Sequence, residues 1–192
     1  MNEGLIELPP GHVGAVVTFL EMDERPAPAP LPPSPLRIAR WDELDPDRYR
    51  ALFRRVGGRW LWFSRLAMSD RELRARAGEV HEVVDAAGSP AGMIELDFRS
   101  EGLCRILFLG LVPELAGQGH GRWLFAETLA RAWAPGVRQV TVHTCSLDHP
   151  AALPSYLRAG FVARGRAFES FPDPRLTGLL PREVAPQLPL VG

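Results

Sequence analysis

The segment from residue 103 to residue 145 constrains the fold more than any other part of the chain. An apolar run, LCRILFLGLV, is followed by a glycine-rich loop, a helix-like stretch at about 119–134 and a second β-rich run, VRQVTVHTC. A strand, a helix and a strand joined in this order form a crossover, which predicts that the two strands are parallel. The glycine-rich loop lies inside this crossover, at the entrance to its helix.

Local signals predict the remaining elements. Asp45-Pro46 begins one helix that reaches Gly57, and Ser69, with Glu72 three residues later, begins another that ends near Gly78. β-Branched, apolar runs bounded by turn residues predict strands. We expect them at about 12–22, 36–41, 79–86, 91–98, 103–112, 137–145 and 161–171, with a short further helix at about 150–160. This order predicts an α+β fold whose mixed, mostly antiparallel sheet is flanked by helices.

The length of 192 residues suits a single domain spanning residues 1–192. Within it, residues 1–35 should form a strand and a proline-rich connector, and residues 172–192 an irregular tail. The run PAPAPLPPSP (26–35) favours an extended polyproline conformation. The alternative, that it is a ligand for a proline-binding domain, stays open.

Charge and cysteine content exclude several function classes. The formal net charge of −1 gives no general attraction to nucleic acid or to an anionic membrane. All 22 basic residues are arginines, which codon usage explains without any functional role. Cys104 and Cys145 lack CxxC spacing, and we find no cluster of metal ligands. The N-terminal apolar run is too short to span a bilayer, so we expect a cytoplasmic protein without a metal.

The loop GQGHGR places glycines at the alternate positions 117, 119 and 121. It is not a Rossmann GxGxxG motif, and a P-loop is excluded because the chain has no lysine. Free N–H groups at a helix N-terminus nevertheless bind phosphate, and glycines let the phosphate approach the backbone. The alternative is a tight turn that only packs the helix on the strand.

Two segments resemble the GNAT family of N-acetyltransferases. LGLVPELAGQGHGRWLF is similar to the family's acyl-CoA loop, Arg/Gln-x-x-Gly-x-Gly/Ala, and HPAALPSYLRAGF is similar to its Asn-x-x-Ala-x-x-x-Tyr-x-x-x-Gly-Phe motif. The resemblance covers roughly residues 80 to 170. Ala116 stands where the family has Arg or Gln, which implies a missing side-chain contact to the pyrophosphate. His149 stands at the asparagine position, where imidazole can still donate a hydrogen bond.

The resemblance implies acetyl-CoA as co-substrate and parallel strands that part where the glycine loop begins. The backbone at Leu109, Gly110 and Leu111 would pair with the pantetheine arm and help to hold the thioester oxygen. The pyrophosphate would lie on residues 117–122. The cofactor-binding residues would thus be Leu109, Gly110, Leu111, Gly117, Gln118, Gly119, His120, Gly121, Arg122 and His149.

Tyr156 aligns with the family's general acid, although it could instead be a packed aromatic residue. The general base is left open. Glu95, between Ile94 and Leu96, could lie in the cleft or in solvent. His143 is of the residue type that titrates near neutral pH, and it points away from the core if Val142 points inward, but it could also serve only for packing. A lone cysteine, Cys145, could suggest an acyl-enzyme but is more typical of packing.

Trp60 and Trp62, in GGRWLWFSRL, could line an amine pocket through cation–π contacts or could belong to the core. The hypothesis is an N-acetyltransferase that acts by direct attack of a small-molecule or peptide amine in a ternary complex. No nucleic acid or membrane partner is expected, and a homodimer is possible. The alternatives are an acyl-CoA-binding sensor without catalysis and an acetyltransferase of protein N-termini or side chains.

Overall fold

The predicted crossover is present and its strands are parallel. In the computed structural model, which describes residues 4–27 and 29–191, β5 (Leu103–Leu111) leads through α3 (His120–Ala132) to β6 (Gln139–Cys145). Residues 103–106 of β5 pair in parallel with residues 139–142 of β6. A short 3₁₀ turn, η2 (Pro113–Leu115), precedes the glycine loop.

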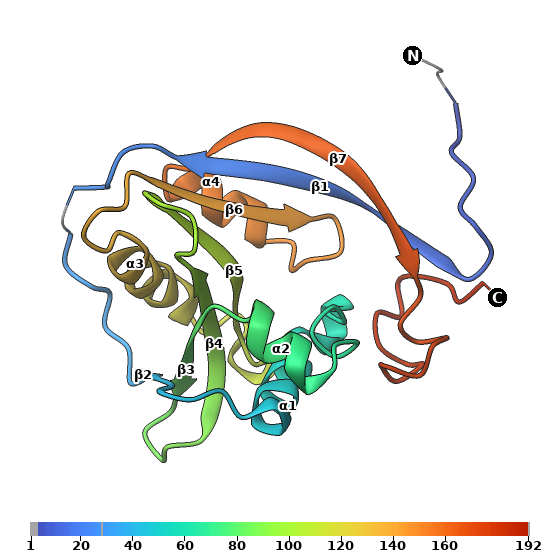
Figure 1. Ribbon diagram of the computed structural model, residues 1–192, viewed down its shortest axis with the longest axis horizontal. Helices are drawn as coiled ribbons and strands as arrows, with labels where there is room; N and C mark the ends of the chain where they lie inside the picture. Colours follow the sequence, from blue (N-terminus) through green and yellow to red (C-terminus); the bar gives the residue numbers. More distant parts are fainter. Residues whose placement is uncertain (1–3, 28, 192) are drawn as a thin grey trace.

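The other elements agree with the expected α+β arrangement. One seven-stranded sheet, in the order β2-β3-β4-β5-β6-β1-β7, is antiparallel except at the β5–β6 pair. Helices cover both of its faces (Figure 1). The further strands and helices are β1 (His12–Met22), β2 (Arg37–Arg40), α1 (Pro46–Gly57), η1 (Gly58–Trp60), α2 (Asp70–Arg76), β3 (Glu79–Val84), β4 (Pro90–Asp97), α4 (Ala152–Arg158) and β7 (Val162–Pro172).

The local helix signals act as predicted. The Asp45 side chain accepts hydrogen bonds from the N–H groups of Asp47 and Arg48 at the start of α1. Ser69 and Glu72 form a complete capping box at the start of α2. These caps satisfy N–H groups that a helix cannot pair internally, so they define where each helix begins.

The N-terminal strand β1 lies between β6 and β7 rather than at an edge of the sheet. It pairs with β6 from Val17↔Cys145 to Met22↔Val140, and with β7 along almost its whole length. Its two faces contribute to different cores: Leu20 packs with α3 and α4, and Ala15 packs on the side of α1 and α2. The position of β1 between these strands was not predicted.

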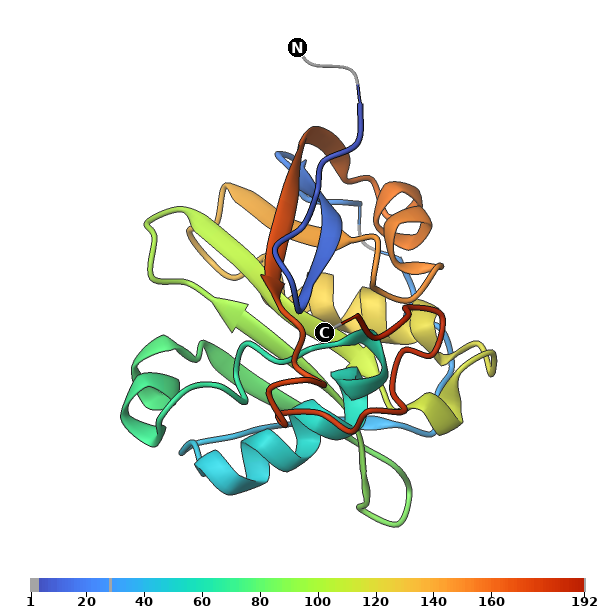
Figure 2. The ribbon, with the colours of Figure 1, turned by 90° about the vertical axis from the view of Figure 1, so that its right-hand side faces the viewer.

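From residue 173 to residue 191 the chain forms no helix or strand, and this segment is packed against the protein. Leu180 and Ala185 are buried in the apolar cluster that also contains α1 (Figure 2). Arg175 is buried as well: it pairs with Asp173 and donates to the carbonyls of Val184, Ala185 and Leu188. A charged arginine is tolerated in this position because its N–H groups are paired.

Candidate functional site

β5 and β6 part in the middle of the sheet. Their pairing ends at Ile106↔Val142, but β5 continues along β4 to Leu111 and β6 continues along β1 to Cys145. A bulge at Leu107 of β5, opposite Glu95 and Leu96, lies where the strands begin to separate. We call the space between residues 107–111 of β5 and residues 143–145 of β6 the gap.

One side of the gap is formed by the residues that the resemblance assigned to the cofactor's arm. Leu109 and Gly110 pair with Ile94 and Met93 of β4, and Leu111 pairs with Gly92. Over the described chain, the β5–β6 register does not extend to these three residues. The backbone groups of β5 that face β6 are therefore free to pair with an extended ligand.

The glycine loop follows this strand end and leads into α3. Gly117 and Gly119 have φ values of +76° and +84°, a region that side chains other than glycine rarely adopt. Gly119 is the N-cap residue of α3, and no side chain caps this helix. A Cβ atom added at Gly117, Gly119 or Gly121 would meet no atom within 4 Å. The loop is thus an exposed helix N-terminus that a large anion can reach.

The side chains of the loop contribute less than its backbone. Gln118 turns back to donate to the carbonyl of Glu114, and Nδ1 of His120 lies 3.4 Å from the Ser34 hydroxyl. Arg122 is exposed and lies in the first turn of α3. A Cβ atom at Gly121 would meet no neighbouring atom, so close packing does not require a glycine at this position. Space for a ligand therefore explains Gly121 better than a tight turn does.

Tyr156 lies on α4, buried between Phe125 and Phe161, whose rings meet it edge-on at 4.9 and 5.6 Å. Burial raises the pKa of the Tyr156 phenol, and the nearby Asp148 carboxylate raises it further. The phenol therefore carries its proton throughout the physiological pH range. Packing and a role as proton donor are compatible for this residue.

Glu95 faces neither an open cleft nor solvent. It is fully buried, and its carboxylate accepts hydrogen bonds from the Tyr49 hydroxyl, the Arg65 guanidinium at 2.7 Å and the Gly78 N–H at 3.1 Å. These donors come from α1, from the segment after η1 and from the residue directly before β3. The carboxylate joins these segments to β4, so its geometry gives no support to a role as general base.

His143 is the first residue of β6 beyond the paired register. It is exposed and shares the α1 and α2 face of the sheet with Cys145, which packs against that core. Its ring lies 6.3 Å from that of Phe19, its partner on β1. The side chain is thus at the start of the gap with access to solvent.

The two tryptophans take different positions. Trp62 is half-buried against Phe53 and Phe108, at 5.5 and 5.1 Å between ring centroids, and so belongs largely to the core. Trp60 meets the ring of His149 edge-on at 5.2 Å. Nδ1 of His149 in turn accepts a hydrogen bond from the Ala151 N–H at 3.0 Å, which orients the imidazole at the start of α4.

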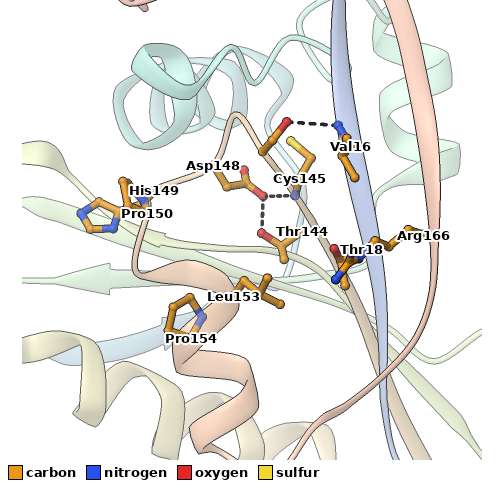
Figure 3. A pocket seen from close by; sticks show the side chains of 11 residues that line it. Val16, Thr18, Thr144, Cys145, Asp148, His149, Pro150, Leu153, Pro154 and Arg166 are labelled. Carbon is orange, nitrogen blue, oxygen red and sulfur yellow. Dashed lines mark hydrogen bonds between the residues drawn. The ribbon is translucent and has the colours of Figure 1, made fainter. Parts of the chain in front are cut away.

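Asp148 was not identified from the sequence. It lies directly before His149 in the turn after β6, and Trp62 donates to it from the other side of the gap. Asp148 and His149 also line an open hollow of about 430 Å³ between α4 and strands β1 and β7 (Figure 3). The only sequence signal for Asp148 was its position directly before the motif that begins at His149. No local pattern indicated that Trp62 would be its partner.

Among residues 4–27 and 29–191, no group of three or more His, Cys, Asp or Glu side chains is placed to hold a metal ion. No helix in the described part of the chain is long and apolar enough to cross a membrane. Both cysteines are free thiols.

Comparison with known proteins decides the family. The model of the GNAT acetyltransferase family matches residues 18–161, which is most of the chain and includes the gap and the glycine loop. The chain belongs to the GNAT family of acetyltransferases. The match begins inside β1, so it includes the last five of the eleven residues of the strand that lies between β6 and β7.

Known structures of the family have the same fold. A GCN5-related N-acetyltransferase of Sphaerobacter thermophilus superposes with a TM-score of 0.57 at 21% identity, over 85% of this chain and 52% of that one. A protein of Novosphingobium aromaticivorans assigned to the GNAT family superposes with a TM-score of 0.55 at 21% identity, over 87% of this chain and 69% of that one. For a GCN5-related N-acetyltransferase of Kribbella flavida the TM-score is 0.51 at 15% identity, over 88% of this chain and 63% of that one.

This chain spans about half the length of the Sphaerobacter protein, and at these identities the likeness concerns the fold alone. No curated protein matches the sequence significantly.

The open space at Gly121 can be tested by adding a methyl group. Gly121 lies in the first turn of α3, where alanine is the better helix former by up to ~1 kcal/mol. We expect Gly121→Ala to leave the thermal stability equal or higher, while the Kd for acetyl-CoA rises by ~5-fold or more as one phosphate hydrogen bond is lost. Isothermal titration calorimetry and thermal unfolding measure the two effects.

Gly165→Ala is the matched control, since a Cβ atom at this β7 residue would also meet open space. It should leave the Kd for acetyl-CoA unchanged. Equal Kd values for both variants and the wild type would show that the loop is only a turn.

Replacement of Glu95 should lower the free energy of unfolding, because the carboxylate is part of the buried structure. Glu95→Gln leaves the buried Arg65 guanidinium without its counter-charge, which typically costs ~3–5 kcal/mol. Glu79→Gln is the control, because it breaks the exposed Arg40 pair and should cost less than ~1 kcal/mol. Urea unfolding measures both. Unchanged stability together with lost turnover would instead make Glu95 the base.

Proposed function

We propose that this protein is an N-acetyltransferase that transfers the acetyl group of acetyl-CoA to the primary amine of a small molecule or peptide. The observation that carries the proposal is the gap in the sheet, which opens at the strand end that leads to an uncapped helix N-terminus. The gap offers unpaired backbone to an extended arm, and the helix end offers N–H groups to a pyrophosphate. Acetyl-CoA supplies a thioester whose carbonyl carbon accepts the amine.

The residues present fit this co-substrate. The free space around Gly117, Gly119 and Gly121 would accommodate the phosphates, and the backbone of Leu109, Gly110 and Leu111 would hold the arm. A backbone N–H of β5 would stabilise the oxyanion that forms as the amine attacks, a contribution of about 10²–10³ in rate. Ala116 adds no polar contact of its own, so the main chain would provide most of the binding.

Tyr156 is the proposed general acid. Its phenol keeps its proton at neutral pH because burial raises its pKa, and it lies on the α3 and α4 side of the sheet. The phenol would protonate the departing thiolate as the carbon–sulfur bond breaks. The proton that the attacking nitrogen still carries would then return to the phenolate.

His143 is the proposed general base, in preference to Glu95. Its ring is exposed at the start of the gap, whereas the Glu95 carboxylate is buried and occupied by Tyr49, Arg65 and Gly78. The imidazole would take the first proton from the acceptor's ammonium, on the face opposite to Tyr156. General acid–base catalysis of this kind typically contributes ~10²–10⁴ in rate.

Tyr156→Phe tests the acid. The substitution removes the hydroxyl and keeps the ring contacts with Phe125 and Phe161. We expect kcat to fall by ~10²-fold or more while the Kd for acetyl-CoA changes little. A screen of primary amines with free-thiol detection provides the assay. An unchanged kcat would exclude Tyr156 from the chemistry, and binding without turnover of any amine by the wild type would favour an acyl-CoA sensor.

His143→Gln tests the base through the pH dependence of kcat/KM. An ammonium acceptor must lose a proton before attack, so kcat/KM should rise with pH and then level off. If His143 is the base, the variant should lose the acidic limb of this profile and keep its affinity for acetyl-CoA. Retention of the limb would mean that the base is water or another group.

A further inference from the structure

Hydrogen bonds join the two sides of the gap through one carboxylate. From the α1 and α2 side, the Trp62 indole N–H donates to Oδ1 of Asp148 at 3.1 Å. From β6, the Thr144 hydroxyl and the Cys145 N–H donate to Oδ2 at 2.6 and 2.9 Å. Figure 3 shows Asp148 turned back onto the end of its own strand.

Trp62 is held on the β5 side of the gap. Its ring contacts Phe108 of β5, and it packs so closely that a Cβ atom on Gly57 would lie 2.1 Å from the ring. A Cβ atom on Gly110 of β5 would come within 3.6 Å of the ring's far edge. The indole therefore cannot follow Asp148 if β6 moves, because glycines let it pack directly on α1 and β5.

Asp148 is held on the β6 side. Thr144 and Cys145 are the last two residues of β6, and both bind the same carboxylate oxygen. The turn that carries Asp148 is thereby fixed to the strand end. The Trp62–Asp148 hydrogen bond consequently links β5 to β6 beyond the point where their backbone pairing stops at Ile106 and Val142.

We propose that the Trp62–Asp148 hydrogen bond is a brace that sets the width of the gap, and that both are positioning residues for the arm of acetyl-CoA. The inference rests on the proposed function, since it assigns the gap to that arm. Paired strands lie about 4.8 Å apart, and an arm that pairs with both edges needs them further apart and fixed. Because the brace fixes the strands before binding, less conformational entropy is lost when the ligand binds.

The brace also explains why residue 148 carries a charged carboxylate and not a neutral acceptor. A hydrogen bond from a neutral indole to a charged acceptor is stronger than one between neutral groups. The same carboxylate contributes to the raised pKa of Tyr156, the proposed acid. Asp148 acts through strand spacing in this proposal, and no proton transfer to it is required.

The test measures the Kd for acetyl-CoA in four variants. Trp62→Phe removes the indole N–H and keeps an aromatic ring, and Asp148→Ala removes the acceptor. Each should raise the Kd by ~10-fold, the effect of one hydrogen bond to a charged group. The Trp62→Phe/Asp148→Ala double variant should show no larger rise than Asp148→Ala alone, rather than ~100-fold, because Asp148→Ala already breaks the hydrogen bond that Trp62→Phe removes. Asp148→Asn keeps an acceptor oxygen and should recover part of the affinity.

Trp41→Phe is the matched control. It breaks another indole–carboxylate hydrogen bond, Trp41 to Glu82 at 3.4 Å, on the β2–β3 side of the sheet, and should leave the Kd unchanged. Additive losses in the double variant, or equal effects of Trp62→Phe and Trp41→Phe, would overturn the brace while leaving the proposed function intact. If the wild type itself does not bind acetyl-CoA, the proposed function and the brace both fail.

Discussion

The separation of β5 from β6 is possible because each strand keeps a partner on its other side. β4 pairs with β5 to Leu111, and β1 pairs with β6 to Cys145. An unpaired backbone group that is also shut off from water is expensive, so a sheet opens at low cost only where solvent or a ligand can replace the missing bonds. The insertion of β1 is thus a condition for the gap: without it, the end of β6 would have no partner on either side.

A second constraint lies beneath the gap, at Glu95. Its carboxylate accepts hydrogen bonds from α1, from the segment after η1 and from the residue directly before β3, all at one point on β4. A buried ion pair adds little net stability compared with apolar packing, but loss of one partner is severe. Glu95 is for this reason needed for the fold, which leaves His143, Tyr156 and the main chain as the groups proposed for the chemistry of the gap.

Sequence reasoning succeeded where the signals are local. The Asp45 cap, the Ser69–Glu72 capping box and the glycine loop before α3 each depend on residues within one helical turn, and the structure contains them all. The parallel β5–β6 pair also followed from the order of the elements, because a crossover through a helix returns in parallel.

The features that were not predicted all depend on residues far apart in the chain. β1 lies between two strands that come more than a hundred residues later, which no local pattern encodes. Trp62 and Asp148 are 86 positions apart, and their contact exists only once α1 and β6 are both in place. The burial of Glu95 was missed for the same reason: a carboxylate between apolar neighbours looks the same in sequence whether its partners are water or Arg65.

The gap also bears on the proposed acid, Tyr156, and the proposed base, His143, which would act without contact between them. Tyr156 belongs to the core on the α3 and α4 side, while His143 shares the α1 and α2 side with Cys145. In a continuous sheet these two faces are separated by the backbone and its hydrogen bonds. Where β5 and β6 part, a ligand between them is reached from both faces, so a proton can be removed on one side and supplied on the other. The proposed chemistry therefore depends on the opening in the sheet, and the side chains around it act only because that opening exists.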